Sequence, residues 1–161
     1  MLVVDAVWQE RYWYPEEGGE VWVAGYQLVE PQSGRYLGRD APELAARGLR
    51  ISAVAGAGMH HAPALGSEEA APGSSLVLRR DPGNPHDPNA IAVLGAGADA
   101  EQLGWVPREL AAELASSLDA GDPWSALILR EQRRSPRDGR HGLTMLLAPT
   151  AGLELRDVPD R

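Results

Sequence analysis

Apolar residues alternate with polar and aromatic ones in two stretches near the start of the chain, Leu2 to Trp8 and Val21 to Val29. A period of two is typical of strands that bury one face. The run 15–19, Pro-Glu-Glu-Gly-Gly, lies between them and is rich in turn-forming residues. This pattern predicts an amino-terminal β-hairpin.

A capping pattern follows the hairpin. Asp40 stands three residues before Glu43, which is the spacing of a capping box, and Gly48 follows a short helix-forming stretch. Glycine commonly ends a helix because it adopts the left-handed conformation without strain. The spacing predicts a helix of about two turns from Asp40 to Gly48.

Short apolar runs separated by segments rich in Gly, Pro and Ala begin at Leu49. Runs of this length and pattern indicate strands. Strands are therefore expected at 49–55, 75–80, 90–94 and 102–106, with a closing hairpin at 124–131 and 142–147.

A longer helix is expected from Pro107 to just before Gly121. Proline favours the first helical position because its fixed φ suits a helix and its missing N–H is not needed there. The following apolar residues recur at the spacing of one buried helical face. They are Leu110, Ala111, Leu114, Ala115 and Leu118.

Many short strands with one or two short helices predict a mainly β fold with minor α, a small closed or partly closed β-barrel of about six strands. We expect the barrel at residues 49–147. Residues 1–48, the hairpin and short helix, are expected to form an extension. Residues 148–161 contain two prolines and mixed charge, and are expected to be a tail.

The chain carries a net charge of −8, from 23 acidic and 15 basic residues, and has no cysteine. This charge argues against broad non-specific binding to nucleic acid, which depends on neutralising phosphates. Disulfides and thiolate metal sites are excluded. No apolar run is long enough to cross a membrane, and the first residues lack the basic and apolar regions of a signal peptide. We therefore expect a soluble, cytoplasmic protein.

Positive charge concentrates around the turn of the closing hairpin. Only Glu131 and Asp138 oppose the arginines there, so the segment is a candidate basic patch, although a solvated hairpin tip has the same composition. The arginines are Arg130, Arg133, Arg134, Arg137 and Arg140.

Both asparagines of the chain, at positions 84 and 89, lie in the run 80–91, Arg-Asp-Pro-Gly-Asn-Pro-His-Asp-Pro-Asn-Ala-Ile. Asn84 and Asp87 each precede a proline, which pushes them into extended conformations, and short Asn and Asp side chains commonly bond to nearby backbone groups. The loop is therefore expected to be stiff. It either shapes a ligand pocket or only builds a turn before the next strand.

The loop is followed by the run 104–109, Gly-Trp-Val-Pro-Arg-Glu. This order and spacing resemble the HIRAN domain family over roughly residues 50–147. The resemblance implies a compact β-barrel related to the OB-fold and a non-catalytic nucleic-acid-binding module. In helicase-like DNA-repair relatives the domain grips the 3′ end of single-stranded DNA, and in bacteria it often occurs as a small protein.

The resemblance also implies site residues. Asn84 and Asp87 match loop residues that touch the terminal nucleotide in DNA-binding relatives, and Arg108 matches a basic residue that meets phosphate. Their chemistry agrees, because a carboxylate accepts the hydrogen of a free 3′ hydroxyl and repels a 3′ phosphate. Arg108 would also lie in the first turn of the Pro107 helix, which favours anions.

Four further residues complete the expected nucleic-acid-binding set. His86 stands where relatives have a tyrosine that stacks on a base, and Trp105 stands where some have histidine. The stretch Gly58-Met59, after the strand at 49–55, lacks an Arg-Tyr pair of the relatives, which His60 or His61 would partly replace, and Arg80 begins the loop motif. Stacking is worth ~1–3 kcal/mol per base, so the loss of an aromatic platform would weaken binding.

Neither a metal site nor catalysis is expected. His60, His61, His86 and Asp87 could converge on zinc, but no spacing is present that would aim two imidazoles at one ion. The sequence lacks a Walker loop, a dinucleotide fingerprint, a nucleophile elbow and a cysteine nucleophile. We expect no cofactor and no enzyme activity.

The alternative function is an acidic protein-interaction module with little or no DNA binding, docked on a helicase, nuclease or other DNA-processing protein. Aromatic residues concentrate in the amino-terminal hairpin and form either a small core or a partner surface. They are Trp8, Tyr12, Trp13, Tyr14, Trp22 and Tyr26. The choice between DNA and RNA, and the oligomeric state, stay open.

Overall fold

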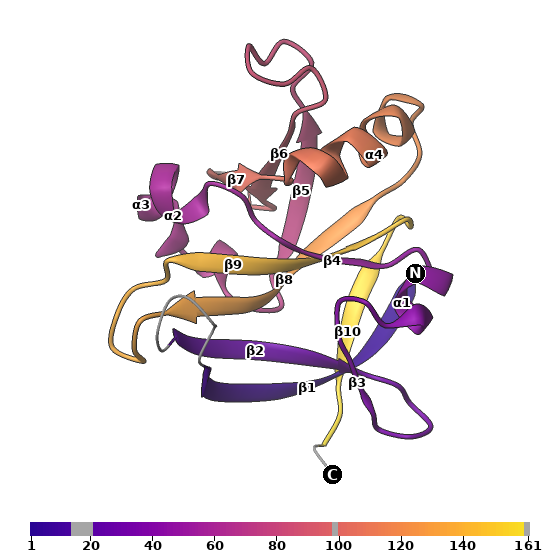
Figure 1. Cartoon of the computed structure of the whole chain (residues 1–161), viewed down its shortest axis with the longest axis vertical. Coiled ribbons are helices and arrows are strands. Elements are labelled where there is room, and N and C mark those ends of the chain that lie inside the picture. Colours follow the sequence, from indigo (N-terminus) through magenta and orange to yellow (C-terminus); the bar gives the residue numbers. More distant parts are fainter. Residues whose placement is uncertain (14–20, 98–99, 160–161) are drawn as a thin grey trace.

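Figure 1 shows the fold in a computed structural model that describes residues 1–13, 21–97 and 100–159, except the side chains of residues 59, 60 and 62. The strands are β1 (Leu2–Trp13), β2 (Val21–Val29), β3 (Tyr36–Leu37), β4 (Arg50–Ala53), β5 (Ser75–Arg80), β6 (Ile91–Gly95), β7 (Gln102–Trp105), β8 (Ser125–Arg133), β9 (Gly142–Ala148) and β10 (Leu153–Asp157). The helices are α1 (Pro42–Ala46), α2 (Ala57–His60), α3 (Ala62–Leu65), the 3₁₀ turn η1 (Glu68–Ala70) and α4 (Arg108–Asp119).

All ten described strands belong to one sheet, whose main path runs β10-β1-β2-β8-β5-β6-β7. Beside this path, β3 pairs with β2, and β9 links β8 to β4. In Figure 1, β8 and β9 cross the middle of the molecule, with β5 to β7 and α4 above them and β1 and β2 below. The prediction of a mainly β fold is confirmed. The sheet is not a closed barrel, because β10 and β7 stay at opposite ends of the path.

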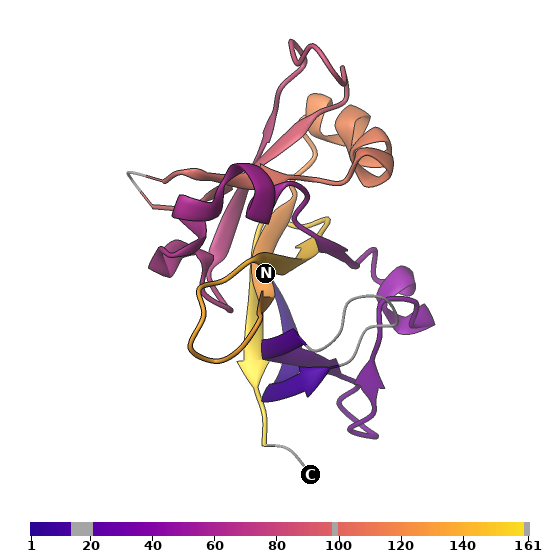
Figure 2. The same cartoon turned by 60° about the vertical axis from the view of Figure 1, so that its left-hand side comes forward.

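The strand β8 separates two hydrophobic cores. Ala126 and Ile128 point into one core, with α4 and β6, whereas Leu127 and Leu129 point into the other, with β1, β2 and α1. Successive side chains on a strand point to opposite faces, so one strand can serve both cores. Figure 2, turned by 60°, shows the elements of the two halves on either side of β8 and β9.

The amino-terminal hairpin is confirmed as β1 paired antiparallel with β2, in a register that joins Ala6 to Leu28. The turn expected at residues 15–19 lies outside the described residues. The hairpin is not an appendage, because β2 also pairs with β8 over Trp22 to Gly25. Gly25 permits this contact. It has a φ of +148°, and a Cβ there would lie 2.6 Å from the Cα of Arg130.

Helix α4 forms where the apolar spacing predicts it. Ala111, Leu114 and Ala115 are buried on its inner face. Pro107 has an extended ψ of 144° and is the N-cap rather than the first helical residue, so the helix begins at Arg108. Within the described part of the chain, no helix combines the length and apolar character needed to cross a membrane.

The capping box expected at Asp40 does not form. Helix α1 begins at Pro42 after Ala41 as N-cap, with no side-chain cap, and spans five residues rather than two turns. Glu43 instead forms an ion pair with Arg35. The proline sets the start of the helix, and the nearby arginine takes the carboxylate that a capping box would use.

The carboxyl-terminal segment expected to be a tail contains β10, which pairs in parallel with β1 in a register that joins Leu2 to Leu153. Leu153 is buried in the second core. Arg156 holds the buried Asp5 with an Nε–Oδ1 distance of 2.6 Å. The expectation was wrong because the stabilising partner lies at the other end of the chain, where no local pattern shows it.

Candidate nucleic-acid interface

The loop between β5 and β6 is shaped by its own side chains. The Oδ1 of Asn84 accepts hydrogen bonds from the backbone N–H groups of His86 at 2.9 Å and Asp87 at 3.2 Å. The Oδ1 of Asp87 accepts one from the N–H of Asn89 at 2.9 Å. These are the local bonds expected of Asn and Asp in turns. The local hydrogen bonds predicted for this loop are therefore present, and Asn84 is one of the residues that shape it.

Arg80 ties the base of this loop to α4 and does not line the pocket described below. Its guanidinium donates to the carbonyls of Ala90 at 2.9 Å and Pro88 at 3.1 Å. It also forms an ion pair with Asp119, near the end of α4, at 2.9 Å. The hydrogen bond to Asp119 raises the pKa of Arg80 above its ordinary value. Arg80 thus supports the loop from the side of α4 and lies outside the pocket.

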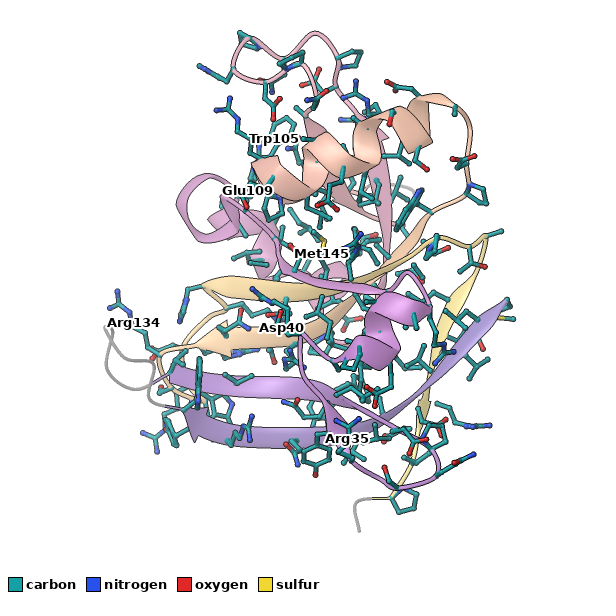
Figure 3. The ribbon with its side chains drawn as sticks, turned by 45° about the vertical axis from the view of Figure 1, so that its right-hand side comes forward. Arg35, Asp40, Trp105, Glu109, Arg134 and Met145 are labelled. Atoms are coloured by element: carbon teal, nitrogen blue, oxygen red, sulfur yellow. The ribbon has the colours of Figure 1, made fainter. Side chains whose placement is uncertain are left out.

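The other loop candidates meet around one open pocket of about 290 Å³, which we name the loop pocket. In Figure 3, Trp105 lies beside the beginning of α4, with Glu109 close to it. The loop pocket joins five residues expected from the sequence, Asn84, His86, Asp87, Trp105 and Arg108, with Ala55, Ala90 and Val106.

Gly104 allows Trp105 to reach this position. The backbone N–H and C=O of Trp105 bond to those of Ala55, at 2.9 and 2.8 Å. A Cβ on Gly104 would lie 2.5 Å from the carbonyl oxygen of Ala55. Because only glycine fits so close an approach, Gly104 allows the backbone of Trp105 to pair with Ala55 beside the pocket.

Asp87 and Arg108 place opposite charges side by side at the loop pocket, with an Oδ2–Nε distance of 3.6 Å. The Asp87 side chain is 18% exposed and the Arg108 side chain 72%. Arg108 also donates a hydrogen bond to the carbonyl of His86. A recessed acceptor beside an exposed cation suits a ligand that carries both a hydroxyl and an anionic group.

The start of α4 adds to the anionic preference of this site. The N–H groups of a first helical turn have no partner within the helix, and the helix dipole makes that end positive. The N-cap, Pro107, supplies no side-chain cap. Arg108 is the first residue of this turn, so its guanidinium and the helix end are available to the same anion.

Two histidines near α2 were also considered from the sequence. His60 ends α2, and its side chain lies outside the described residues. His61 is partly buried after α2 and does not line the pocket. Among the described side chains, no group of three His, Asp or Glu is arranged to hold a metal ion.

The apolar lining of the pocket was missed by the sequence interpretation. Val106 and Ala90 lie within the two motifs, but a small apolar residue beside a polar motif is indistinguishable from ordinary core. Ala55 reaches the pocket through its backbone bridge to Trp105, a residue far along the sequence. No local signal marks it.

The basic patch expected in the closing hairpin is dispersed. Arg133 and Arg140 both form ion pairs with the buried Glu131, at 3.0 Å for Arg133. Arg140 also donates to the carbonyl of Leu65 at 2.8 Å. These two guanidinium groups bind the protein's own carboxylate and backbone, so they do not contribute to a free basic surface.

A family model for the HIRAN domain matches residues 51–135, more than half of the chain. The chain belongs to the HIRAN domain family. The matched range contains both the loop and Arg108, and therefore the whole charged part of the loop pocket.

Two individual proteins are similar to parts of the chain. A Fanconi-associated nuclease 1 homolog from Oryza sativa subsp. japonica is 58% identical over 48 residues, which are 29% of this chain and 5% of that protein. The chain thus spans a small fraction of this curated relative. The crystal structure of the HIRAN domain of human HLTF matches 62% of this chain and 75% of that one, with 22% identity and a TM-score of 0.43.

Proposed function

We propose that this HIRAN domain is a non-catalytic module that binds single-stranded DNA at a free 3′ end, in repair, replication or defence. The observation that carries the proposal is the meeting of Asp87, Arg108, His86 and Trp105 around one pocket. The family assignment and the similarity to a nuclease homolog support a setting in nucleic-acid metabolism.

Each group has a distinct role in this proposal. The Oδ2 of Asp87 accepts the hydrogen of the 3′ hydroxyl, since its Oδ1 already holds the N–H of Asn89. Arg108 and the first turn of α4 meet the last phosphodiester. Trp105 and His86 offer flat faces for the terminal base, against the apolar lining.

The same arrangement disfavours a 3′ phosphate. A terminal phosphate would bring further negative charge to the recessed Asp87 carboxylate, which Arg108 at 3.6 Å only partly offsets. The net charge of −8 opposes binding of the remaining strand, and Arg108 alone releases few counter-ions, so affinity should change only weakly with salt.

The test is fluorescence anisotropy at low salt with a short single strand that ends in a 3′ hydroxyl, against the same strand with a 3′ phosphate. The proposal expects tighter binding of the hydroxyl end, weakened in Arg108→Ala. Arg79→Ala is the matched control, because Arg79 is exposed on β5 and does not line the loop pocket. Equal binding of both strands would overturn end recognition.

A second candidate is docking on a helicase, nuclease or other DNA-processing protein. One observation favours it: the described aromatic residues Trp8 and Tyr12 of β1 are 40% and 43% exposed, on the same face of the strand. They form edge-to-face pairs with Tyr26 and Trp22, so they are held in place and only partly covered. Loss of a purified partner's binding in Trp8→Ser with Tyr12→Ser, with DNA binding retained, would support it.

A further inference from the structure

A second pocket, of about 300 Å³, lies between the first β-hairpin and the closing hairpin. Three arginines line it, and they come from distant parts of the chain: Arg11 from β1, Arg39 from the segment after β3, and Arg130 from β8. No Asp or Glu is among its described lining residues. We name it the arginine pocket.

The register of the sheet places these side chains on one face. Arg11 lies opposite Val23, which lies opposite Gln132, so one row crosses three strands. The next row joins Gly25, Arg130 and Thr144. Because alternate residues of a strand share a face, Arg11, Arg130 and Gln132 face the same side of the sheet. Gly25 has no side chain, which leaves room for the Arg130 side chain beside β2.

The arginine pocket does not overlap the loop pocket, since the two have no lining residue in common. In Figure 3, Trp105 lies with α4 in the upper part of the molecule, whereas Asp40, the neighbour of Arg39, lies over the strands below. A ligand of the arginine pocket therefore needs no part of the 3′-end site.

The positive charges of this pocket are uncompensated within the described residues. The described part of the chain contains seven ion pairs. Each uses another arginine, and none uses Arg11, Arg39 or Arg130. Arg130 donates to the carbonyl of Tyr26 at 2.8 Å, a neutral acceptor. The carboxylate next to it in sequence, Glu131, faces the other side of β8 and is held by Arg133 and Arg140.

This arrangement is costly without a counter-ion. Burial, together with the smaller effect of the charges of Arg11 and Arg39, lowers the pKa of Arg130 to about 10. Partly buried charges without a partner destabilise a fold, and like charges add to the cost. An anion seated among the three guanidinium groups would offset both effects.

The side chains around the arginines narrow the class of anion. Guanidinium forks bind phosphate oxygens in pairs, more selectively than a point charge does. Trp13, which is 55% exposed, lies on the same strand face as Arg11 and gives a flat apolar surface. Gln132 donates to Thr144 at 2.9 Å, and together they form a polar wall. A phosphate beside a flat ring is the chemistry of a nucleotide.

We propose that the arginine pocket is a second binding site, which holds the phosphate of a nucleotide unit between Arg11, Arg39 and Arg130 with the base against Trp13. The nucleotide unit belongs either to a single strand or to a free nucleotide. The site is independent of the proposed recognition of a 3′ end.

The test uses two probes on the full chain, a single strand blocked by a 3′ phosphate and free ATP, with binding followed by calorimetry at low salt. Arg11→Gln with Arg39→Gln removes two exposed guanidinium groups and leaves the partly buried Arg130 in place, so the fold should persist. We expect at least one probe to bind the wild type and to bind this variant about tenfold more weakly or worse, since each charge-assisted hydrogen bond contributes ~1.5–3 kcal/mol. Arg79→Gln with Arg47→Gln, exposed arginines outside the pocket, should bind like the wild type.

The outcomes distinguish a nucleic-acid strand from a free nucleotide as the ligand. They also distinguish the arginine pocket from the proposed 3′-end site. Tighter binding of the strand assigns the site to nucleic acid, and equal or tighter binding of ATP assigns it to a free nucleotide. Arg11→Gln with Arg39→Gln should weaken binding of the blocked strand by the same factor in an Asp87→Asn background, because the two sites share no residue. If neither probe binds, or if the arginine variant binds both as the wild type does, the proposal is wrong. Tripolyphosphate binding with no loss in Trp13→Ala would overturn the nucleotide assignment.

Discussion

The loop pocket and the arginine pocket handle positive charge in opposite ways. In the loop pocket, Arg108 is exposed and stands 3.6 Å from a recessed carboxylate of Asp87. In the arginine pocket, Arg130 is partly buried and meets two further arginines instead of an acid. A balanced pair discriminates between ligands that differ in one charge, whereas an unbalanced cluster attracts any well-placed anion. If both proposed sites bind a strand, the loop pocket would provide selectivity and the arginine pocket affinity.

The largest effect on stability is expected from Gly104→Val, which would disturb the backbone next to the loop pocket. The added side chain would meet the carbonyl of Ala55 and the side chain of Val54, so the bridge that fixes Trp105 must open. We expect a loss of about 1–3 kcal/mol or more in the free energy of unfolding, measured by urea denaturation. Gly83→Ala is the control, since a Cβ there meets nothing within 4 Å. An equal loss in both variants would contradict the explanation.

Asp87→Asn tests the selectivity of the loop pocket. Asparagine keeps an oxygen for the N–H of Asn89 and removes the negative charge. We expect the preference for a 3′ hydroxyl over a 3′ phosphate to fall by about tenfold, because a close charge pair is worth ~1–4 kcal/mol near a protein surface. Anisotropy with both strands measures this ratio. An unchanged ratio would show that the carboxylate does not face the strand end.

Arg80→Ala separates loop support from ligand contact. The change removes the hydrogen bonds to Pro88 and Ala90 and the ion pair with Asp119, so the loop should open more often while the rest of the sheet is unaffected. Hydrogen exchange should quicken at the N–H groups of Asp81 and Ala90, which close the loop. Arg79→Ala, its exposed neighbour, should leave both unchanged. Loss of DNA binding without faster exchange would instead make Arg80 a direct contact.

The smallest effect is expected from Arg130→Met in the arginine pocket. The pKa of Arg130 is lowered in the folded state, so the unfolded chain binds this proton more tightly. The resulting cost is fully present at neutral pH and fades only as pH rises above about 10. Methionine removes the charge but also the bond to Tyr26, so we expect the melting temperature at pH 7 and low salt to rise by at most ~4 °C. A fall would show that the lost bond to Tyr26 outweighs the cost of the unpaired charge.

The sequence predicted the elements whose bonds are local. The strand β5, the helix α4 and the loop that follows β5 form where expected, since proline, glycine and Asx side chains act on their nearest neighbours. Local patterns did not predict the start of α1, where Glu43 pairs with Arg35, or the strand β10, whose pairing partner is β1. Both failures have the same cause, a partner that is distant in sequence.

The loop pocket was therefore largely determined by the sequence itself. Its polar residues lie within 25 positions of one another, from Asn84 to Arg108, and the turn that presents Asn84, His86 and Asp87 is held by its own hydrogen bonds. The arginine pocket was decided only by the tertiary structure. Residues 11, 39 and 130 carry no common pattern, and they meet because β2 pairs with β8 across the close approach at Gly25.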